Sequence, residues 1–217
     1  MKKDSLGSEL IRLYNNQDAY IKFYVKARSR LLKFDHYSKF FSRRGLIIDV
    51  GCGYGVLANY LSLYLPDSQI IGIDLNSKRI DAALKTIGSR KNINFLAEDA
   101  TQWVWPDCTG ISMTDFLHHV TPSDQQKILQ NVFRSLREGG TLLISEVDPN
   151  AKPFYRYWAS YLSDRVLYPF SKSYFRSISA WKGTLSRLGF DVRIVKRPNL
   201  IFAGINFICR KQGDGDT

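Results

Sequence analysis

The sequence predicts a doubly wound α/β fold, in which helices cover both faces of a mostly parallel sheet. Apolar, strand-like runs alternate along the chain with helical patterns. The first such run, Leu46–Val50, leads into three glycines within five residues, which is typical of a strand, a tight turn and a helix start. The next runs, Ile70–Asp74 and Ile93–Ala97, end at or beside acidic residues. A length of 217 residues suits a single domain, residues 1–217.

The elements of the first half follow from spacing and end signals. Residues 8–42 carry apolar side chains at mixed spacings of three and four, which predicts two or three short helices before the first strand. The helix after the glycine turn is expected over Val56–Leu65, since Pro66 follows it. Ser77 is expected to cap the next helix, which should end at Gly88. Its buried positions are expected to be Ile80, Leu84 and Ile87.

The second half continues the alternation. Thr121 and Pro122 are typical of a helix start, and this helix is expected to run to about Glu138. A last helix is expected to end at Gly189, because glycine readily adopts the backbone conformation that closes a helix. The strands expected in this half are Gly110–Met113, Thr141–Val147, Asp191–Val195 and Leu200–Cys209.

The glycine turn and the strand ends indicate a nucleoside-containing cofactor. The turn has the pattern GxGxG, and Val56 stands where a dinucleotide-binding turn would have its last glycine, which argues against a nicotinamide cofactor. About twenty residues later, Asp74 ends the second strand, where a carboxylate can accept both hydroxyls of a ribose. Asp99 follows the third strand, where it can accept the adenine amino group.

Together these segments resemble the class I S-adenosylmethionine (SAM) dependent methyltransferases, with DVGCGYG, GIDL and AEDA as their first three motifs. The resemblance covers roughly residues 46–148 and continues more loosely to 209. It implies a Rossmann-like, seven-stranded sheet with an antiparallel last strand, N-terminal helices and a helical cap. It also implies SAM as cofactor and S-adenosylhomocysteine (SAH) as product. The expected cofactor-binding residues are Asp49, Gly51, Cys52, Gly53, Tyr54, Gly55, Asp74, Leu75, Asp99, Ala100, Thr114 and Asp115.

Charge divides the chain into an acidic core with basic flanks. Residues 1–45, the expected N-terminal helical segment, carry +7; residues 46–150, the expected SAM-binding core, carry −4; and residues 151–217 carry +8. The last part is expected to hold a cap insertion (151–182), followed by the last helix and C-terminal strands (183–210). Basic flanks around the site would attract an anionic partner such as a lipid surface, an acidic carrier protein or nucleic acid. Alternatively, the basic surface only keeps the protein in solution.

Cysteine usage and the lack of a long apolar run bear on location. Cys52, Cys108 and Cys209 lie far apart, without the spacing of metal ligands, which predicts free thiols, no metal and a reducing, cytoplasmic setting. No N-terminal leader pattern or apolar run of about twenty residues is present. The expected location is therefore cytoplasmic, with peripheral contact at the inner membrane surface as the further expectation drawn from the basic flanks.

Candidate catalytic residues follow the fourth and fifth strands, because ligands of open α/β sheets bind at these ends. His118 or His119 can take a proton from a hydroxyl nucleophile. Equally, either ring can pack beneath the loop, bonded to the backbone. Glu146 and Asp148 can orient the acceptor or face the sulfonium charge, or they can cap the following turn.

The cap insertion is unusually aromatic. Residues 153–181 hold ten aromatic side chains in twenty-nine positions, with basic residues between them. Aromatic walls bury apolar substrates, whereas aromatic and basic residues together suit a membrane interface or nucleobases. The alternative is that the aromatics only pack the cap onto the sheet. The expected pocket residues are Trp158, Tyr161, Tyr174 and Arg176.

The sequence thus predicts a methyltransferase acting on an apolar small-molecule, lipid or acyl, or carrier-bound acceptor, with oxygen as the favoured atom. An RNA methyltransferase is an alternative that charge alone favours, and the N/D-P-P-Y/F type of motif is missing after the fourth strand. A non-enzymatic SAM-binding or scaffold protein is the other alternative. The intact acids at 49, 74 and 99 argue against it, and failure to turn over any substrate despite SAM binding would favour it.

Overall fold

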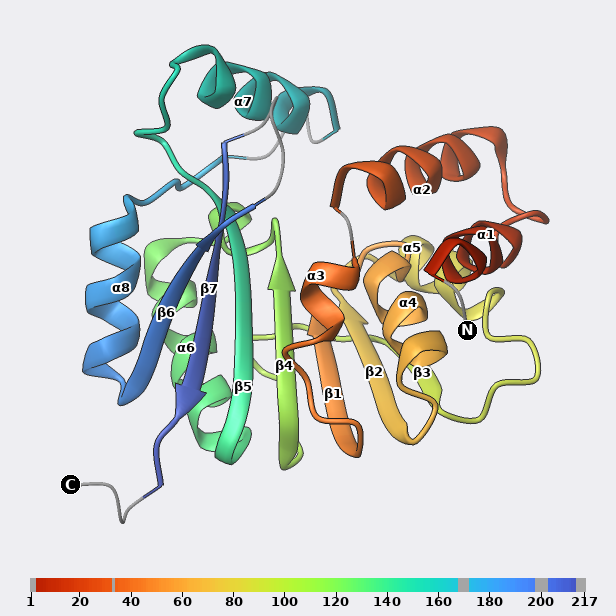
Figure 1. Cartoon of the computed structure of the whole chain (residues 1–217), viewed down its shortest axis with the longest axis horizontal. Helices are drawn as coiled ribbons and strands as arrows, with labels where there is room; N and C mark the ends of the chain where they lie inside the picture. The colour runs from red at the N-terminus through yellow and green to blue at the C-terminus, as the bar shows by residue number, and fades with distance from the viewer. Residues whose placement is uncertain (1–2, 33, 168–171, 198–202, 214–217) are drawn as a thin grey trace.

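The computed structural model describes residues 3–32, 34–167, 172–197 and 203–213. Its strands are β1 (Gly45–Val50), β2 (Ser68–Asp74), β3 (Ile93–Ala97), β4 (Cys108–Thr114), β5 (Leu136–Val147), β6 (Phe190–Lys196) and β7 (Gly204–Lys211). They form one seven-stranded sheet in the order β3-β2-β1-β4-β5-β7-β6 (Figure 1). β1 to β5 are parallel, and β7 is antiparallel to both β5 and β6. The predicted Rossmann-like sheet with an antiparallel last strand is therefore confirmed.

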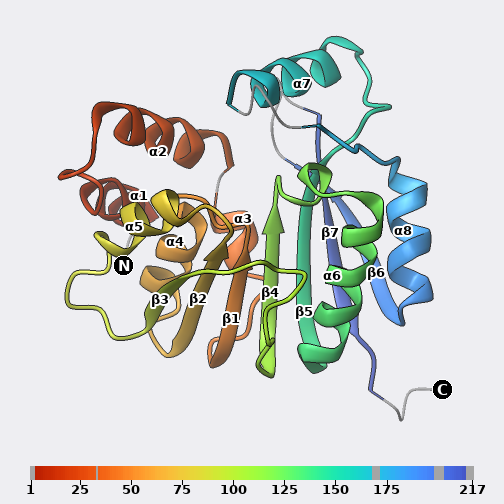
Figure 2. The same ribbon diagram turned by 180° about the vertical axis from the view of Figure 1, so that it is seen from behind.

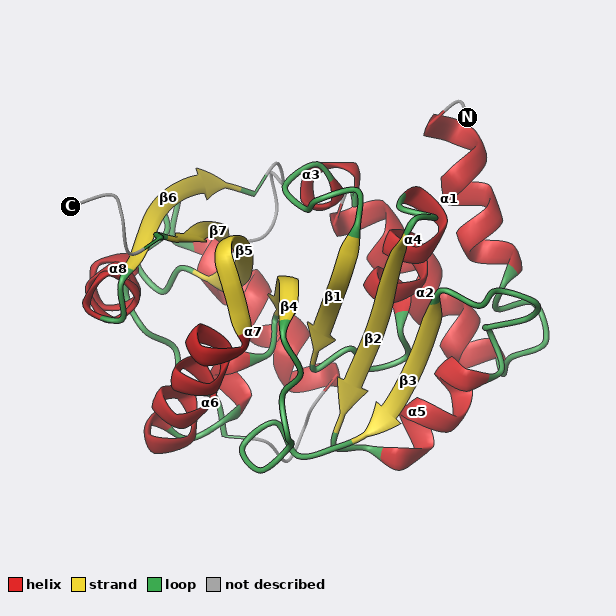
Figure 3. Ribbon diagram, turned by 90° about the horizontal axis from the view of Figure 1, so that it is seen from below, coloured by secondary structure: helices red, strands yellow, loops and turns green. Residues whose placement is uncertain are grey.

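Helices cover both faces of this sheet (Figures 2 and 3). Neighbouring residues of β1 point to opposite faces: Ile47 joins a core with α4 and α5, and Ile48 joins a second core with α6 and α8. The helices are α1 (Lys3–Arg12), α2 (Ala19–Leu32), α3 (Asp35–Ser38), α4 (Val56–Tyr64), α5 (Ser77–Leu84), α6 (Pro122–Ser135), α7 (Tyr155–Leu167) and α8 (Ile178–Arg187), with a 3₁₀ turn η1 (Leu117–His119).

The strand order reverses between β1 and β4, and this is where open α/β sheets bind their ligands. The carboxyl ends of the five parallel strands meet at one edge. α2 and α7 lie beyond that edge, at the top of Figure 1, over different halves of the sheet. The strand order thus places the segments that follow β1 to β5 between the sheet and these two helices.

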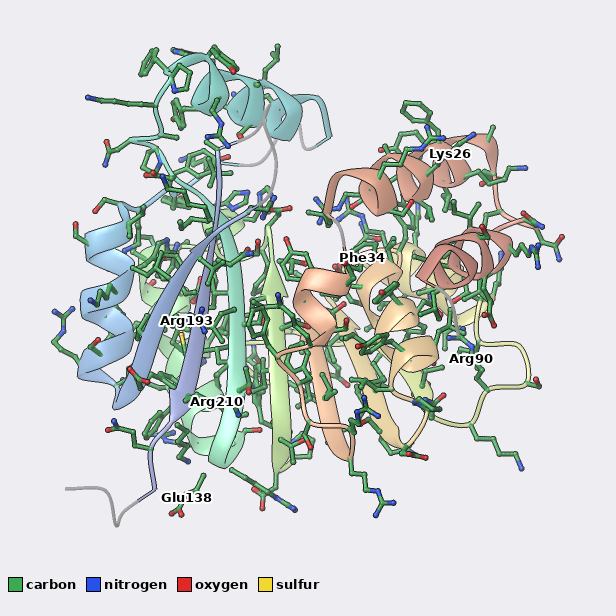
Figure 4. All side chains as sticks on the ribbon, viewed as in Figure 1. Lys26, Phe34, Arg90, Glu138, Arg193 and Arg210 are labelled. Atoms are coloured by element: carbon green, nitrogen blue, oxygen red, sulfur yellow. The ribbon has the colours of Figure 1, made fainter. Side chains whose placement is uncertain are left out.

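The N-terminal helices are attached to the glycine turn. The Tyr14 hydroxyl donates to the carbonyl of Tyr54 at 2.8 Å and accepts from the side-chain amide of Asn59 at 2.8 Å. Asn59 in turn accepts from the guanidinium of Arg90, which is labelled in Figure 4. Gln17 donates to the carbonyl of Ala82 on α5. Hydrogen bonds to α4 and α5 therefore fix the position of α1 and of the start of α2 beside the turn.

Several expected helix ends are corrected by the structure. Asn76, not Ser77, caps α5, because its side chain accepts from the backbone N–H of Arg79. Leu84 is 40% exposed, whereas Ile80 is buried as expected. The helix after Thr121 ends at Ser135 instead of Glu138, since the chain enters β5 already at Leu136.

Other expected elements are confirmed. Thr121 caps α6, Pro122 is in its first turn, and α8 ends just before Gly189. The N-terminal segment forms the expected short helices, and the cap insertion contains α7. Residues 200–202 of the predicted last strand lie outside the described residues. Among the helices that the structure does describe, none has the length and apolar character needed to cross a bilayer.

Tyr14→Phe tests the attachment of the N-terminal helices. The variant loses the donor to the Tyr54 carbonyl inside a buried network, so the free energy of unfolding should fall by about 1–3 kcal/mol. Urea unfolding followed by circular dichroism measures this loss. Tyr20→Phe is the matched control, because Tyr20 is exposed on α2, and it should stay within about 0.5 kcal/mol of the parent protein. Equal effects of the two changes would contradict the attachment.

Candidate functional site

The glycine turn between β1 and α4 forms the floor of the site. Gly51, Gly53 and Gly55 all have positive φ, of 68°, 57° and 73°. A Cβ at Gly51 or Gly55 would run into the ring of Phe116 or Phe95, so these two glycines are needed for packing. Gly53 differs, because a Cβ there would meet no atom within 4 Å. The turn therefore leaves open space beside Gly53, where a ligand can approach the backbone closely.

Asp49 is buried beneath the turn rather than exposed in the site. Its carboxylate accepts from the Ser112 hydroxyl at 2.7 Å and is also bonded to the backbone of Ala58 at the start of α4. Burial raises the pKa of Asp49 to about 7, and these two hydrogen bonds act in the opposite direction. Asp49 therefore links β1, β4 and α4, and by doing so it holds the glycine turn in place.

Asp74 at the end of β2 connects the glycine turn to the next loop. One carboxylate oxygen accepts from the backbone N–H of Gly53 at 2.8 Å and the other from that of Asn76 at 2.9 Å. A carboxylate oxygen has two lone pairs, so each can accept a further hydrogen bond. Leu75 beside it is 76% exposed, an unusual position for a leucine. This strand end thus presents an anionic acceptor next to a free apolar side chain.

Asp99 closes the same half of the edge after β3. It accepts from the backbone and side chain of Thr101, each at 2.8 Å, and from Gln102 at 3.3 Å. These bonds, first the one from the Thr101 backbone, hold the pKa of Asp99 below its ordinary value. Ala100 is buried, and its carbonyl accepts from the Trp105 indole.

The expected cofactor residues of this half fit a SAM molecule. β3, β2 and β1 are neighbours in the sheet, so Asp99, Asp74 and Gly53 follow one another along a single edge. Carboxylates suit the adenine amino group and the ribose hydroxyls, and the open space at Gly53 suits the methionine end. Cys52 in the turn is partly buried, and the Tyr54 ring packs edge-on against Tyr24 of α2.

Asp115 follows β4 and binds two arginines that the sequence did not indicate. Its two oxygens accept from Arg28 of α2 and from Arg197, each at 2.7 Å. Burial alone would raise the pKa of Asp115, but the two guanidiniums outweigh it and hold this pKa well below its usual range. Asp115 adopts φ of 52°, which is rare for a residue other than glycine, and Thr114 before it is buried. Both oxygens of Asp115 thus hold two flanking segments of the chain.

His118 and Glu146 form a buried pair in the other half of the edge. His118 Nδ1 lies 2.5 Å from one Glu146 oxygen, and the other oxygen accepts from the backbone N–H of Leu117 at 2.8 Å. The imidazole stacks on Phe175 with a centroid distance of 4.8 Å, and the His119 ring is 4.2 Å away. Nδ1 of His118 therefore faces the Glu146 carboxyl group, an arrangement in which an imidazole can donate its Nδ1 proton to an acid.

The remaining expected residues divide between the site and the scaffold. Asp148 accepts from the N–H of Asn150, so it caps the turn after β5, as the alternative interpretation had it. Arg176, another expected pocket residue, donates to Thr184 at 2.9 Å and lies over the Trp181 ring, so its guanidinium is directed to α8. The backbone N–H of Tyr174 donates to the carbonyl of His118 at 2.7 Å.

The aromatic residues of α7 are divided between two faces. Trp158, one of the expected pocket residues, is 52% exposed. Tyr157 contacts Phe175 instead, with ring centroids 6.0 Å apart, and Tyr161 packs beside Tyr157. The aromatic wall therefore runs from Tyr157 through Phe175 to His118. Composition alone indicated an aromatic cap but not which rings turn inward.

The described part of the chain holds no group of three His, Cys, Asp or Glu side chains arranged to bind a metal ion. Cys52, Cys108 and Cys209 are free thiols. Acceptors on β1 to β3 and a histidine–carboxylate pair on β4 and β5 are therefore the chemical groups that this edge offers.

Comparison with known proteins agrees with this geometry. Residues 47–140 match a family described as "Methyltransferase domain". The chain is 26% identical over 151 residues to a carboxy-S-adenosyl-L-methionine synthase of Desulfotalea psychrophila, covering 64% of this chain and 59% of that protein. It is 29% identical over 124 residues to a malonyl-[acyl-carrier protein] O-methyltransferase of Legionella pneumophila, covering 56% of this chain and 42% of that protein. The chain thus spans about half the length of these two relatives.

A solved structure extends the likeness to almost the whole fold. Magnesium protoporphyrin IX methyltransferase from Synechocystis, with bound SAH, superimposes with a TM-score of 0.67 at 15% identity. The match covers 94% of this chain and 93% of that one, so the flanking helices and the antiparallel last strand are included in the shared fold.

Asp49→Asn tests the buried carboxyl beneath the turn. Asp49 titrates near 3.8 when unfolded and near 7 when folded, so the unfolded chain releases this proton first as pH rises. As the pH rises from about 4 to about 7, this one group therefore lowers the free energy of unfolding, by at most about 1.4 kcal/mol per pH unit. The asparagine variant lacks the effect, so urea unfolding should show it gaining on the parent protein across that window. Parallel pH curves would contradict the buried, protonated state.

Gly53→Ala tests whether a ligand occupies the space beside Gly53. Gly88→Ala is its matched control, because Gly88 has nearly the same φ, 59°, and the same open space, but lies after α5. Both variants should lose about 1–2 kcal/mol of unfolding free energy through backbone strain. Only Gly53→Ala should also weaken SAH binding, by roughly tenfold or more in calorimetry, because the methyl group overfills the ligand's space. Equal SAH affinities would place the cofactor elsewhere.

Proposed function

We propose that this chain, a member of the class I SAM-dependent methyltransferase family, transfers the methyl group to a hydroxyl of an apolar acceptor. The acceptor is a small molecule or the acyl or aromatic part of a lipid or a carrier-bound compound. The observation that carries this proposal is the buried pair of His118 and Glu146 at the end of an aromatic wall. An oxygen nucleophile needs a proton acceptor more than an amine or a carbanion does.

The pair supplies that proton acceptor. Glu146 is held by the Leu117 N–H and receives the Nδ1 proton of His118, so Nε2 of His118 is the basic atom. As the hydroxyl oxygen attacks, Nε2 takes its proton, and Glu146 stabilises the resulting imidazolium. Both side chains are at most 2% exposed, so the bound acceptor meets a base that water scarcely reaches. Glu146 acts through His118 and is a positioning residue.

The cofactor half of the site needs no further chemistry from the protein. The sulfonium of SAM already activates the methyl group, so positioning the two reactants in line supplies most of what is required. Asp99 would hold the adenine amino group, Asp74 the ribose hydroxyls and the turn at Gly53 the methionine end. Asp49 supports the turn from below, and Leu75 would cover the adenosine.

The aromatic wall sets the class of acceptor. Phe175 stacks on His118, and Tyr157 stands beside Phe175. Flat aromatic surfaces of this kind bury apolar groups and gain several contacts at little cost in side-chain entropy. One relative is named for a carrier-protein-bound acceptor, which supports an acyl or carrier-bound compound here. No observed feature favours RNA over these acceptors.

Methyl-labelled SAM and a lysate of the source cells provide the test. After incubation, label is counted in the organic, protein and RNA fractions. Label in the organic or carrier-protein fraction supports the proposal and leads to mass spectrometry of the product. Label in RNA would overturn the choice of acceptor. Binding of SAH without label in any fraction would favour a SAM-binding scaffold.

His118→Gln tests the base in the same assay. The glutamine cannot accept the proton as the imidazole does, so labelling should fall by about 10²–10⁴-fold. The affinity for SAH, measured by calorimetry, should stay unchanged, because His118 lies outside the cofactor half. His119→Gln is the matched control and should retain most of the labelling. A greater loss of labelling in His119→Gln than in His118→Gln would show that His119, and not His118, is the base.

A further inference from the structure

The outer face of α7 is apolar and exposed. Phe154 immediately precedes α7, and Trp158 and Leu162 follow it at intervals of four residues, so the three lie on one side of the helix. Their side chains are 63%, 52% and 65% exposed, and Arg165 continues the same face. A contiguous row of large exposed apolar side chains is typical of a surface that binds another protein or a membrane.

Packing of α7 onto the protein does not require this face. Tyr157 on the inner side contacts Phe175, and the Ser160 hydroxyl accepts from the backbone N–H of Ala203 at 2.9 Å. The inner face thus meets the site while the outer face meets solvent. The aromatic composition of the cap therefore serves two different purposes.

α2 repeats the arrangement on the other side of the site. Phe23 is 73% exposed, and Lys26 and Arg30 share its side of the helix. Tyr20 is 55% exposed at the start of α2, a helix that has four basic residues and no acidic one. Lys26 projects from α2 at the same end of the molecule as α7 (Figure 4). Of the twelve exposed large apolar side chains in the described residues, six belong to these two regions.

We infer that the outer faces of α2 and α7 together dock on an anionic phospholipid bilayer. Aromatic rings mixed with Lys and Arg suit the headgroup region, where rings enter the apolar boundary and cations meet lipid phosphates. The two helices lie over different halves of the sheet edge, so a broad surface contacts both at once (Figure 1). The net charges of +7 and +8 on the flanks complement such a surface, and the acidic core does not.

The inference deepens the proposed function and rests on it in one respect. If the acceptor is apolar, docking with α2 and α7 on the bilayer would turn the carboxyl edge of the sheet toward the phase in which such a molecule dissolves. His118 lies at that edge. The docking itself depends only on the exposed side chains and charges of the two helices.

Vesicle co-sedimentation of the full chain tests the docking. The protein is expected to bind vesicles of phosphatidylcholine mixed with phosphatidylglycerol, and to bind phosphatidylcholine alone much more weakly. The double change Phe154→Ser and Leu162→Ser should reduce the partition coefficient on the order of tenfold or more. Lys26→Gln should reduce it by about fivefold on the anionic vesicles only. Val104→Ser is the matched control, because Val104 is 88% exposed in the loop after β3, and should change nothing.

SAH binding by each variant shows that it is folded. Equal vesicle binding by the double variant and Val104→Ser, or no binding to anionic vesicles, would overturn the docking. Binding to an acidic acyl carrier protein but not to vesicles would overturn the membrane docking in favour of a carrier-protein partner. Self-association of the protein that the double change abolishes would overturn it in favour of a second copy of this chain. Vesicle binding without any methyl transfer would leave the docking standing and overturn the proposed function alone.

Discussion

One carboxylate, Asp115, holds together the three parts of the chain that enclose the site. It follows β4 at the strand reversal, and its oxygens bind Arg28 from the N-terminal helices and Arg197 from the segment after β6. Without a carboxylate between them, these two largely buried guanidiniums would lose hydration and repel each other, which costs free energy. The shared carboxylate of Asp115 offsets that cost. The left-handed backbone at Asp115 is tolerated because both partners fix it. This contact joins both flanks to the loop after β4, in addition to the hydrogen bonds of Tyr14 and Gln17 that hold the N-terminal helices.

Burial works in opposite directions on the acids of this edge. Asp49 lies beneath the turn with only neutral donors in hydrogen-bond contact, so desolvation raises its pKa to about 7. Asp115 is buried too, yet two guanidiniums reverse the effect. Asp74 and Asp99 keep acceptor positions toward the open side. The same residue type thus supports the turn, joins the flanks and presents acceptors at the open edge of the sheet, according to its neighbours.

The fold and the glycine turn with acids at the strand ends could be predicted from the sequence, because there the pattern is local. Glycines at 51, 53 and 55 and acids at strand ends are readable from spacing, since each acts within a few residues of its strand. Arg28 and Arg197 were missed because their partner is 82 or more residues away and arginine in a basic flank carries no pattern. The inward turn of Tyr157 instead of Trp158 was also beyond reach, because adjacent aromatics satisfy either orientation. Asn76 and Ser77 are both residue types that cap helices, so the pattern of residues alone does not fix which of the two begins α5.

The strand reversal separates the two chemical tasks in space. Polar acceptors follow β1, β2 and β3, whereas the pair of His118 and Glu146 and the aromatic wall belong to β4, β5 and the segments after them. Asp115 lies at the boundary. A polar, charged cofactor and an apolar acceptor can then approach from different sides, and neither has to cross the other's lining. The exposed rings of α7 belong to the apolar side, where they add little to stability because they remain in solvent. Aromatic residues on a cap are therefore best understood by what each face of the cap meets: the protein's own aromatic wall on the inside and the surroundings of the protein on the outside.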